Sequence, residues 1–256
     1  MAARERVSGE PASGNGASSF HLIWEMPQLP LLEVSATVEI LAPPAVRRLY
    51  FWALQVSFAG ERRLQGGAHI GLQWNPRHPG STAVNWGGYD SADAGSQLLS
   101  GSESTLPSSR SDPNTRDFRW SPGHRYRLRV APAGEGPDGL SAWRGTVTNL
   151  ESGERVTVRD LYSRGRFLVA PMVWSEVFAR CEQPSVTARW SALQAITSTG
   201  EEMHPQRVRV NYQGRRDGGC DNTTVSSDEL GILQTTAAQR QVPQGAILPV
   251  AGLTEI

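Results

Sequence analysis

Indole, phenol and short polar side chains gather beside two turns of the chain, and these residue types are well suited to holding a ligand. They occur at Trp74-Asn75 and in the run Asn85-Trp86-Gly87-Gly88-Tyr89-Asp90. Trp and Tyr faces stack on the apolar face of a sugar ring, Asn, Asp and Gln bind its hydroxyl groups, and glycines let a ligand approach the backbone. We therefore expect a non-catalytic domain that binds a glycan. The proposed contacts are Trp74, Asn75, Trp86, Tyr89 and Asp90, with His69 and Gln73 nearby on one strand. The alternative is that Trp74 and Trp86 pack in the core.

Signatures of catalysis are weak. Glu176, in Trp174-Ser175-Glu176-Val177-Phe178, is the nearest match to a strand carboxylate of a glycan hydrolase. Such enzymes use paired carboxylates, and alternate positions on one strand aim both into one cleft. No Asp or Glu lies two or four residues from Glu176, and no Gly-x-Ser-x-Gly motif occurs. A glycan hydrolase or lyase that uses His69, Gln73 and Glu176 in a cleft remains the enzymatic alternative.

The sequence contains no specific metal or cofactor signature. The histidines are not spaced as metal ligands are; they lie at His21, His69, His78, His124 and His204. Calcium prefers oxygen ligands, and two groups could supply them: Asp90 with Asp93, or Asp112 with Asn114 and Asp117. Neither group has the glycine-turned loop that would make a calcium site specific. We therefore expect no cofactor, and we expect the carboxylates of these two groups to be solvated.

The elements that must position these residues are strands. From about residue 34 onward, apolar and polar residues alternate with period two, as in His124–Val130 and Tyr50–Phe58. Turn signals such as Asn75-Pro76 and Ser121-Pro122-Gly123 separate the stripes, and amphipathic helices are nearly absent. About ten to thirteen short strands without crossover helices predict an all-β protein, an antiparallel β-sandwich or jelly roll.

The chain divides into three expected segments. Residues 1–33 form a disordered or extended leader, because residues 8–19 are rich in Gly, Ser, Ala and Pro. Residues 34–200 form the sandwich, and residues 201–256 form a C-terminal extension that packs on it. Residues 91–114 predict a long loop that is functional or mobile. If that loop filled the open face of a sheet, the protein would be a structural or interaction module without a small ligand.

Composition limits the partners and the compartment. The 256 residues carry 25 basic and 25 acidic side chains, and no apolar run approaches eighteen residues, so we expect neither a membrane partner nor a simple polycation role for this protein. A short basic stripe, Arg207, Arg209, Arg215 and Arg216, is more typical of a solvated strand face than of nucleic-acid binding. No signal peptide is visible, which predicts a cytoplasmic protein. The two cysteines, Cys181 and Cys220, suit one bridge or two buried thiols, and the missing signal favours thiols.

The order of motifs resembles an uncharacterised family of domains of unknown function. The similar motifs are Tyr50-Phe51-Trp52-Ala53-Leu54-Gln55, Gly67-Ala68-His69-Ile70-Gly71-Leu72-Gln73, Asn85-Trp86-Gly87-Gly88-Tyr89 and Trp120-Ser121-Pro122-Gly123-His124-Arg125-Tyr126. The resemblance covers roughly residues 35 to 195 and departs at Ala68-His69, where an aromatic residue is commoner. It implies a concanavalin-A-like jelly roll of the lectin and glucanase type and no established reaction. The tail around Cys220 resembles those of exported actinobacterial proteins, which implies a Cys181–Cys220 disulfide and an extracellular location.

Overall fold

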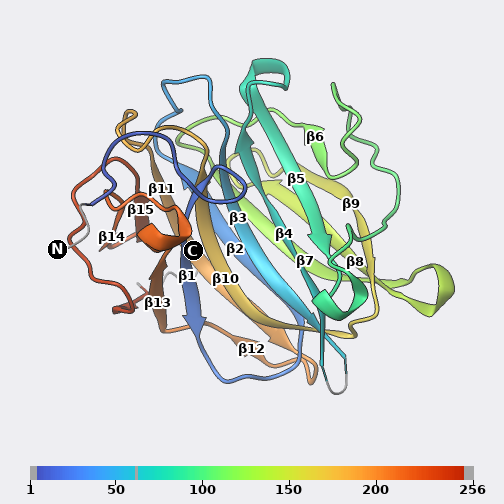
Figure 1. Ribbon diagram of the computed structural model, residues 1–256. Coiled ribbons are helices and arrows are strands. Elements are labelled where there is room, and N and C mark those ends of the chain that lie inside the picture. Colours follow the sequence, from blue (N-terminus) through green and yellow to red (C-terminus); the bar gives the residue numbers. More distant parts are fainter. Residues whose placement is uncertain (1–4, 61–62, 251–256) are drawn as a thin grey trace.

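The computed structural model describes residues 5–60 and 63–250, and within them almost all regular structure is β-strand (Figure 1). Every strand pairing is antiparallel. The remaining regular elements are single 3-10 turns, such as η1 (Pro79–Ser81). The predicted all-β antiparallel sandwich, a concanavalin-like jelly roll, is confirmed.

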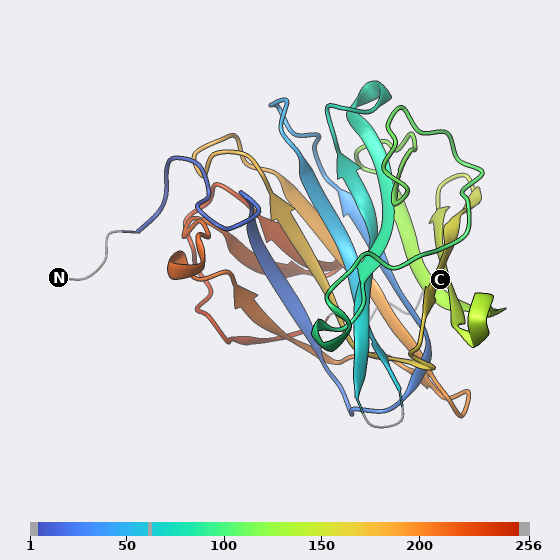
Figure 2. The same ribbon diagram turned by 45° about the vertical axis from the view of Figure 1, so that its right-hand side comes forward.

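Two layers of strands make up the sandwich, as Figures 1 and 2 show. We call one layer the front sheet; its order is β16 (Ile247–Pro249), β13 (Arg207–Tyr212), β1 (Ser18–Glu25), β10 (Phe167–Val177), β3 (Tyr50–Ala59), β4 (Leu64–Trp74), β5 (Thr82–Tyr89) and β6 (Thr115–Asp117). We call the other the rear sheet; its order is β14 (Thr224–Asp228), β15 (Gly231–Thr235), β11 (Thr187–Thr197), β2 (Leu31–Ile40), β7 (Arg125–Glu135), β8 (Ser141–Asn149) and β9 (Arg155–Ser163). The short β12 (Glu202–Met203) pairs with β11, and a single Leu168–Leu31 pair joins the layers.

The hydrophobic core lies between the two sheets and follows the period-two pattern of the sequence. On β3, the side chains at Tyr50, Trp52, Leu54, Val56 and Phe58 are buried against the rear sheet. The reverse face of β3 belongs to a second, small cluster of Phe51, Ala53 and Trp174. This second cluster lies on the outer face of the front sheet, and it is where the candidate site is found.

The N-terminal boundary predicted from the sequence is wrong. Residues 18–33 are not a leader, because β1 pairs with both β13 and β10 in the middle of the front sheet and β2 begins at Leu31. Residues 5–17 lack strands but are held by backbone hydrogen bonds, such as Ala12 N to the oxygen of Gly218 at 2.9 Å. The segment after residue 200 likewise contributes paired strands to both sheets rather than packing on a finished sandwich.

A disulfide joins Cys181 to Cys220, so the expectation of two free thiols is wrong. The backbone of the N-terminal segment bonds beside both cysteines, with Cys181 N donating to the oxygen of Gly9 and Asp221 N donating to the oxygen of Arg6. The disulfide therefore lies next to the point where the N-terminal segment reaches the sheet.

The long loop, residues 91–114, runs from β5 toward β9 along the side of the sandwich (Figure 2). Isolated bridges pair Leu98 with Tyr89 and Gly101 with Leu161. No residue of this loop lines the main cavity described below. None of the helical turns in the described part of the chain is long and apolar enough to cross a membrane.

Candidate functional site

A cavity of about 570 Å³ opens on the outer face of the front sheet. We call it the main cavity. Its lining comes from the N-terminal segment, β1, β10, β3, β4 and the end of β5: Asn15, Ser19, His21, Gln55, Gly67, Ala68, His69, Tyr89, Asp90, Trp174, Glu176 and Phe178.

Strand register places the polar side chains in rows across this face. Residues paired across antiparallel strands point to the same side of a sheet. Gln55 of β3 is paired with Met172 of β10 and with His69 of β4, which makes one row. Glu176 is paired with Phe51 on one side and with Ser19 of β1 on the other, which makes a second row, two positions along β10 from Trp174.

Small residues between these rows leave room for the rings above them. Ala53 and Gly71 are paired with each other, and Ala53 is also paired with Trp174. A Cβ atom built on Gly71 would lie 2.0 Å from the carbonyl oxygen of Trp52 and 2.7 Å from the ring of Phe51. Any side chain at position 71 would therefore force β3 or the ring of Phe51 to move.

His69 is part of an aromatic cluster. Its ring lies 5.4 Å from that of Phe51 and 5.5 Å from that of Trp174, in edge-to-face geometry, and Phe51 and Trp174 are 4.9 Å apart. Burial among these rings lowers the pKa of His69 to about 4, because the imidazolium form loses its hydration. His69 is thus neutral at physiological pH.

Glu176 is the titratable acid at the other end of the cavity. Its Oε1 accepts hydrogen bonds from Asn15 Nδ2 at 3.0 Å and from Ser19 Oγ at 3.2 Å. Burial raises the pKa of Glu176 and outweighs these two bonds, which favour the charged form. Both donors contact Oε1, and no described residue bonds Oε2.

Gln55 and His21 complete the polar lining. Trp174 Nε1 donates to Gln55 Oε1 at 2.9 Å, which fixes the orientation of the amide and leaves Gln55 Nε2 as a donor for a ligand. His21 lies on β1, its ring 6.1 Å from that of Trp174. Burial lowers the pKa of His21, against the opposing effect of a hydrogen bond with the backbone of Asn211.

The structure brings together only some of the residues proposed from the sequence. His69, Tyr89 and Asp90 line the main cavity with Glu176. Gln73 lies on the same face but is buried, its Oε1 accepting from Asn75 Nδ2 at 2.9 Å. Of the predicted glycan contacts, only Tyr89 is a well-exposed aromatic ring, at 51%.

The two predicted indole contacts pack in or against the core, and the prediction for Trp86 is wrong. Trp86 is fully buried in the core, and its Nε1 donates to the carbonyl oxygen of Trp143 at 3.2 Å. Trp74 packs against the core, and its Nε1 donates to the carbonyl oxygen of Val46 at 3.2 Å. Trp86 is not placed to stack on a sugar, because β5 turns it inward, and the bond from Trp74 holds the loop before β3.

Reasoning from the sequence missed five residues that bring polar side-chain groups to the cavity. Gln55 and Trp174 each carry a detectable signal, since Gln55 is a polar residue within an apolar strand and Trp174 lies two residues before Glu176 on the same face. Asn15, Ser19 and His21 carry none, because the segment that holds them was assigned to the leader.

The carboxylates considered for calcium hold loops in place. Asp90 Oδ1 accepts from the backbone of Gln97 at 2.6 Å, and Asp112 Oδ2 accepts from Thr115 Oγ1 at 2.7 Å. Asp117 Oδ1 lies 2.6 Å from His78 Nδ1. Among the described residues, no group of three or more His, Cys, Asp or Glu side chains is arranged to hold a metal ion.

Solved structures similar to this chain are peptidases. Two structures of scytalido-glutamic peptidase with transition-state analogues show 12% and 13% identity and TM-scores of 0.46 and 0.45. SCP-B, a member of the eqolisin family of peptidases in complex with the tripeptide Ala-Ile-His, shows 12% identity and a TM-score of 0.44. Each match covers 90% of this chain and 98% of the other.

No protein-family model matches the chain, and no curated protein matches it. The likeness to the peptidases is therefore one of fold, and the chemistry of the site rests on its own geometry. The prediction of a non-catalytic glycan-binding domain is wrong, because Trp86, one of its two indole contacts, is fully buried and the other, Trp74, packs against the core.

Proposed function

We propose that this protein is a hydrolase that cleaves amide bonds in peptides bound along the main cavity, with Glu176 as the proton-transferring group. The observation that carries the proposal is a partly buried glutamate with a raised pKa that lines a cavity together with uncharged hydrogen-bond donors. Perturbed titratable groups in a cleft mark functional sites, because a proton-transfer group works best with a pKa near the working pH.

The two carboxylate oxygens of Glu176 have different roles. Asn15 and Ser19 hold Oε1, which fixes the carboxylate plane. Oε2 takes a proton from a water molecule as that water attacks the peptide carbonyl carbon. The protonated Glu176 then returns this proton to the leaving amine nitrogen as the C–N bond breaks.

The spacing of the rows suits an extended, chain-like substrate. The Gln55–His69 row lies four residues along β3 from Phe51, the partner of Glu176, and at about 3.3 Å a residue this is about 13 Å. A peptide of about four extended residues spans that distance. Gln55 Nε2 and the neutral His69 ring then bind its backbone while Glu176 acts on a peptide bond at the other end.

Amide hydrolysis fits the acids of the cavity better than glycoside hydrolysis does. Glycosidases generally use two carboxyl groups that flank the scissile bond. The other carboxylate in the main cavity, Asp90, already accepts a hydrogen bond from the backbone of Gln97. A glycan hydrolase is the alternative substrate class, and the same experiment tests it.

The test compares the wild type with Glu176→Gln and with Glu154→Gln, an exposed acid in the β8–β9 hairpin as matched control. Each is incubated between pH 3 and pH 8 with a pool of internally quenched peptides and with a panel of soluble polysaccharides, followed by reducing-end assay. We expect peptide cleavage that rises with pH through the pKa of Glu176. Glu176→Gln should lower kcat by about 100-fold or more, and the control should not.

Equal peptide cleavage by Glu176→Gln and the wild type would overturn the role of Glu176. Absence of peptide cleavage across the pH range would overturn the proposed activity. If the wild type releases reducing ends from a polysaccharide and Glu176→Gln does not, the substrate is a glycan rather than a peptide.

A further inference from the structure

A second cavity of about 390 Å³ adjoins the main cavity, since Phe178 lines both. We call it the arginine pocket. It combines an apolar base with positive charge; its lining includes Arg47, Arg48, Leu49, Asn75, Arg77 and Phe178. The net charge of the whole chain is zero, so this concentration of guanidinium groups is a local feature.

Among the described residues, two of the three arginines have no acidic partner. Arg48 is paired with Glu10 at 3.3 Å. No Asp or Glu side chain in the described part of the chain lies within ion-pair distance of Arg47 or Arg77, and both residues are exposed. A guanidinium presents a planar set of N–H donors that matches a carboxylate in bidentate fashion.

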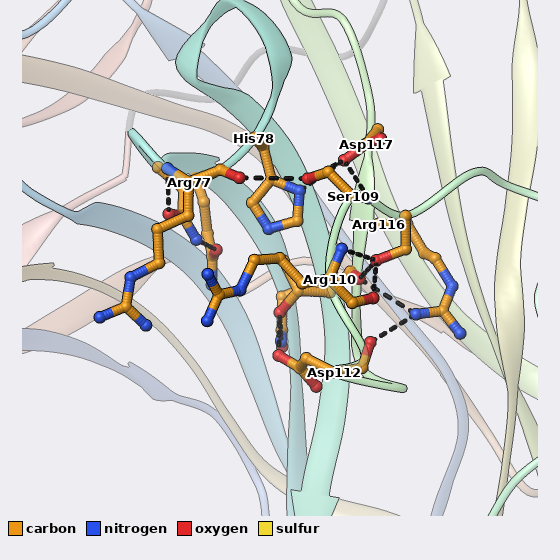
Figure 3. Close-up of polar contacts among 12 residues, drawn as sticks. Arg77, His78, Ser109, Arg110, Asp112, Arg116 and Asp117 are labelled. Atoms are coloured by element: carbon orange, nitrogen blue, oxygen red, sulfur yellow. Dashed lines mark hydrogen bonds and ion pairs between the residues drawn. The ribbon is translucent and has the colours of Figure 1, made fainter.

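Hydrogen bonds hold the backbone of Arg77 on both sides, as Figure 3 shows. Its N–H donates to Asn75 Oδ1 at 3.2 Å, and its carbonyl oxygen accepts from Ser109 Oγ at 3.1 Å. The next residue, His78, is buried and lies 2.6 Å from Asp117 Oδ1, and Ser109 Oγ also bonds that oxygen at 3.2 Å. This network joins the turn before β5 to the long loop and to β6.

The loop on the opposite side of the pocket is also fixed. Trp74 Nε1 donates to the carbonyl oxygen of Val46, and Arg48 N donates to the same oxygen at 3.0 Å. Phe178 N donates to the oxygen of Leu49 at 2.9 Å, which ties this loop to the end of β10. Both loops that carry the arginines are therefore held in place, which lowers the entropy cost of binding an anion between them.

From this arrangement we infer that the arginine pocket binds a carboxylate of the peptide substrate and so makes the enzyme selective for acidic peptides. The inference rests on the proposed peptide-cleaving function and adds the class of peptide. A substrate chain that passes Glu176 in the main cavity reaches Phe178, two residues further along the same strand direction, and then the pocket. The carboxylate is that of an Asp or Glu side chain or of the chain terminus.

The experiment measures binding apart from cleavage. The ligands are eight-residue peptides with no charged side chain other than the one tested, acetylated at the N-terminus and amidated at the C-terminus. One set carries a single Glu at each position in turn, and the matched set carries Gln there. The Gln peptides are also made with a free C-terminal carboxylate. Affinities are measured by titration calorimetry on full-length Glu176→Gln, in which the peptides stay intact. The double variant Arg47→Gln/Arg77→Gln and the control Arg155→Gln are built in this background; Arg155 is exposed on β9 in the rear sheet.

At pH 7 and low salt, we expect one Glu position, or the free C-terminus, to bind about tenfold more tightly than its neutral match. The double variant should abolish that difference, and Arg155→Gln should keep it. In Glu176→Gln with its arginines unchanged, the preference should weaken in about 0.5 M salt and below pH 4, where peptide carboxylates take up protons. If an internal Glu raises the affinity, the pocket binds a carboxylate side chain. If the free C-terminus raises the affinity, the pocket binds the end of the peptide chain.

Equal affinity for charged and neutral peptides, or a preference that survives the double variant, would overturn the inference. The two proposals fail separately. Discrimination without any cleavage by the wild type rejects the hydrolase and keeps the acidic peptide as ligand, whereas cleavage without discrimination rejects only the pocket.

Discussion

The low pKa of His69 makes the stability of the fold depend on pH in a way that one substitution removes. In the unfolded chain this ring titrates near 6.5, and in the folded protein near 4. Between these values the unfolded state binds more protons, so acid favours unfolding. The contribution of His69 is complete above pH 6.5 and is lost as pH falls toward 4. At about 1.4 kcal/mol for each pH unit, the loss on going from pH 7 to pH 4 is about 3 kcal/mol.

His69→Gln keeps a polar side chain of similar reach but cannot titrate. We expect the free energy of unfolding of the wild type to fall by about 3 kcal/mol more than that of His69→Gln between pH 7 and pH 4. Urea titrations followed by circular dichroism at pH 7, 5.5 and 4 measure this difference, and His204→Gln, at an exposed position, is the control. If the wild type and His69→Gln lose stability in parallel, or if NMR finds the His69 ring protonated at pH 6, the aromatic enclosure does not act as described.

Two further changes test the site and the core. Asn15→Ala removes a hydrogen bond that favours the charged form of Glu176, so the pKa of Glu176 should rise further. Both the acidic limb of the peptide-cleavage profile and the carbon-13 titration of a labelled Glu176 carboxyl should then move to higher pH, and an unmoved titration would contradict the contact. Trp86→Ala should lower the free energy of unfolding by about 3–5 kcal/mol, whereas Tyr89→Ala, at an exposed ring, should change it by less than about 1 kcal/mol, both by urea denaturation. Similar small losses for both variants would mean that Trp86 does not hold the core.

Alternation along single strands was enough to predict the class of fold. The apolar stripe of β3 from Tyr50 to Phe58 is buried as its period predicts, because the alternation within a strand specifies which face meets the core. This alternation does not distinguish an indole that packs in the core from one that binds a ligand. Trp86 lies among glycines and polar residues, which suits a binding turn, yet its neighbour in the structure is Gly145 on β8, whose missing side chain makes room for the indole.

The N-terminal boundary was missed because local composition and long-range pairing disagree. Residues 8–19 are rich in small and polar residues, which is typical of an unstructured segment. Their order comes from partners about two hundred residues away: Cys220 N donates to Ser18 Oγ, and Ser19 N donates to Gln213 Oε1. No pattern within the segment reveals such contacts, because the information lies in the other strand.

The role assigned to Glu176 depends on the same long-range pairing. Judged along its own strand, Glu176 lacks a second acid two or four residues away, and this is why the sequence made an enzyme only the alternative interpretation. Its actual partners are Asn15 and Ser19, which β1 brings beside β10 through pairs such as Ser19 with Glu176. These partners are uncharged donors, so they fix one carboxylate oxygen without supplying a charge that would offset burial. A raised pKa is the consequence, and it is this shift, rather than a second carboxylate, that suits Glu176 to accept and return a proton.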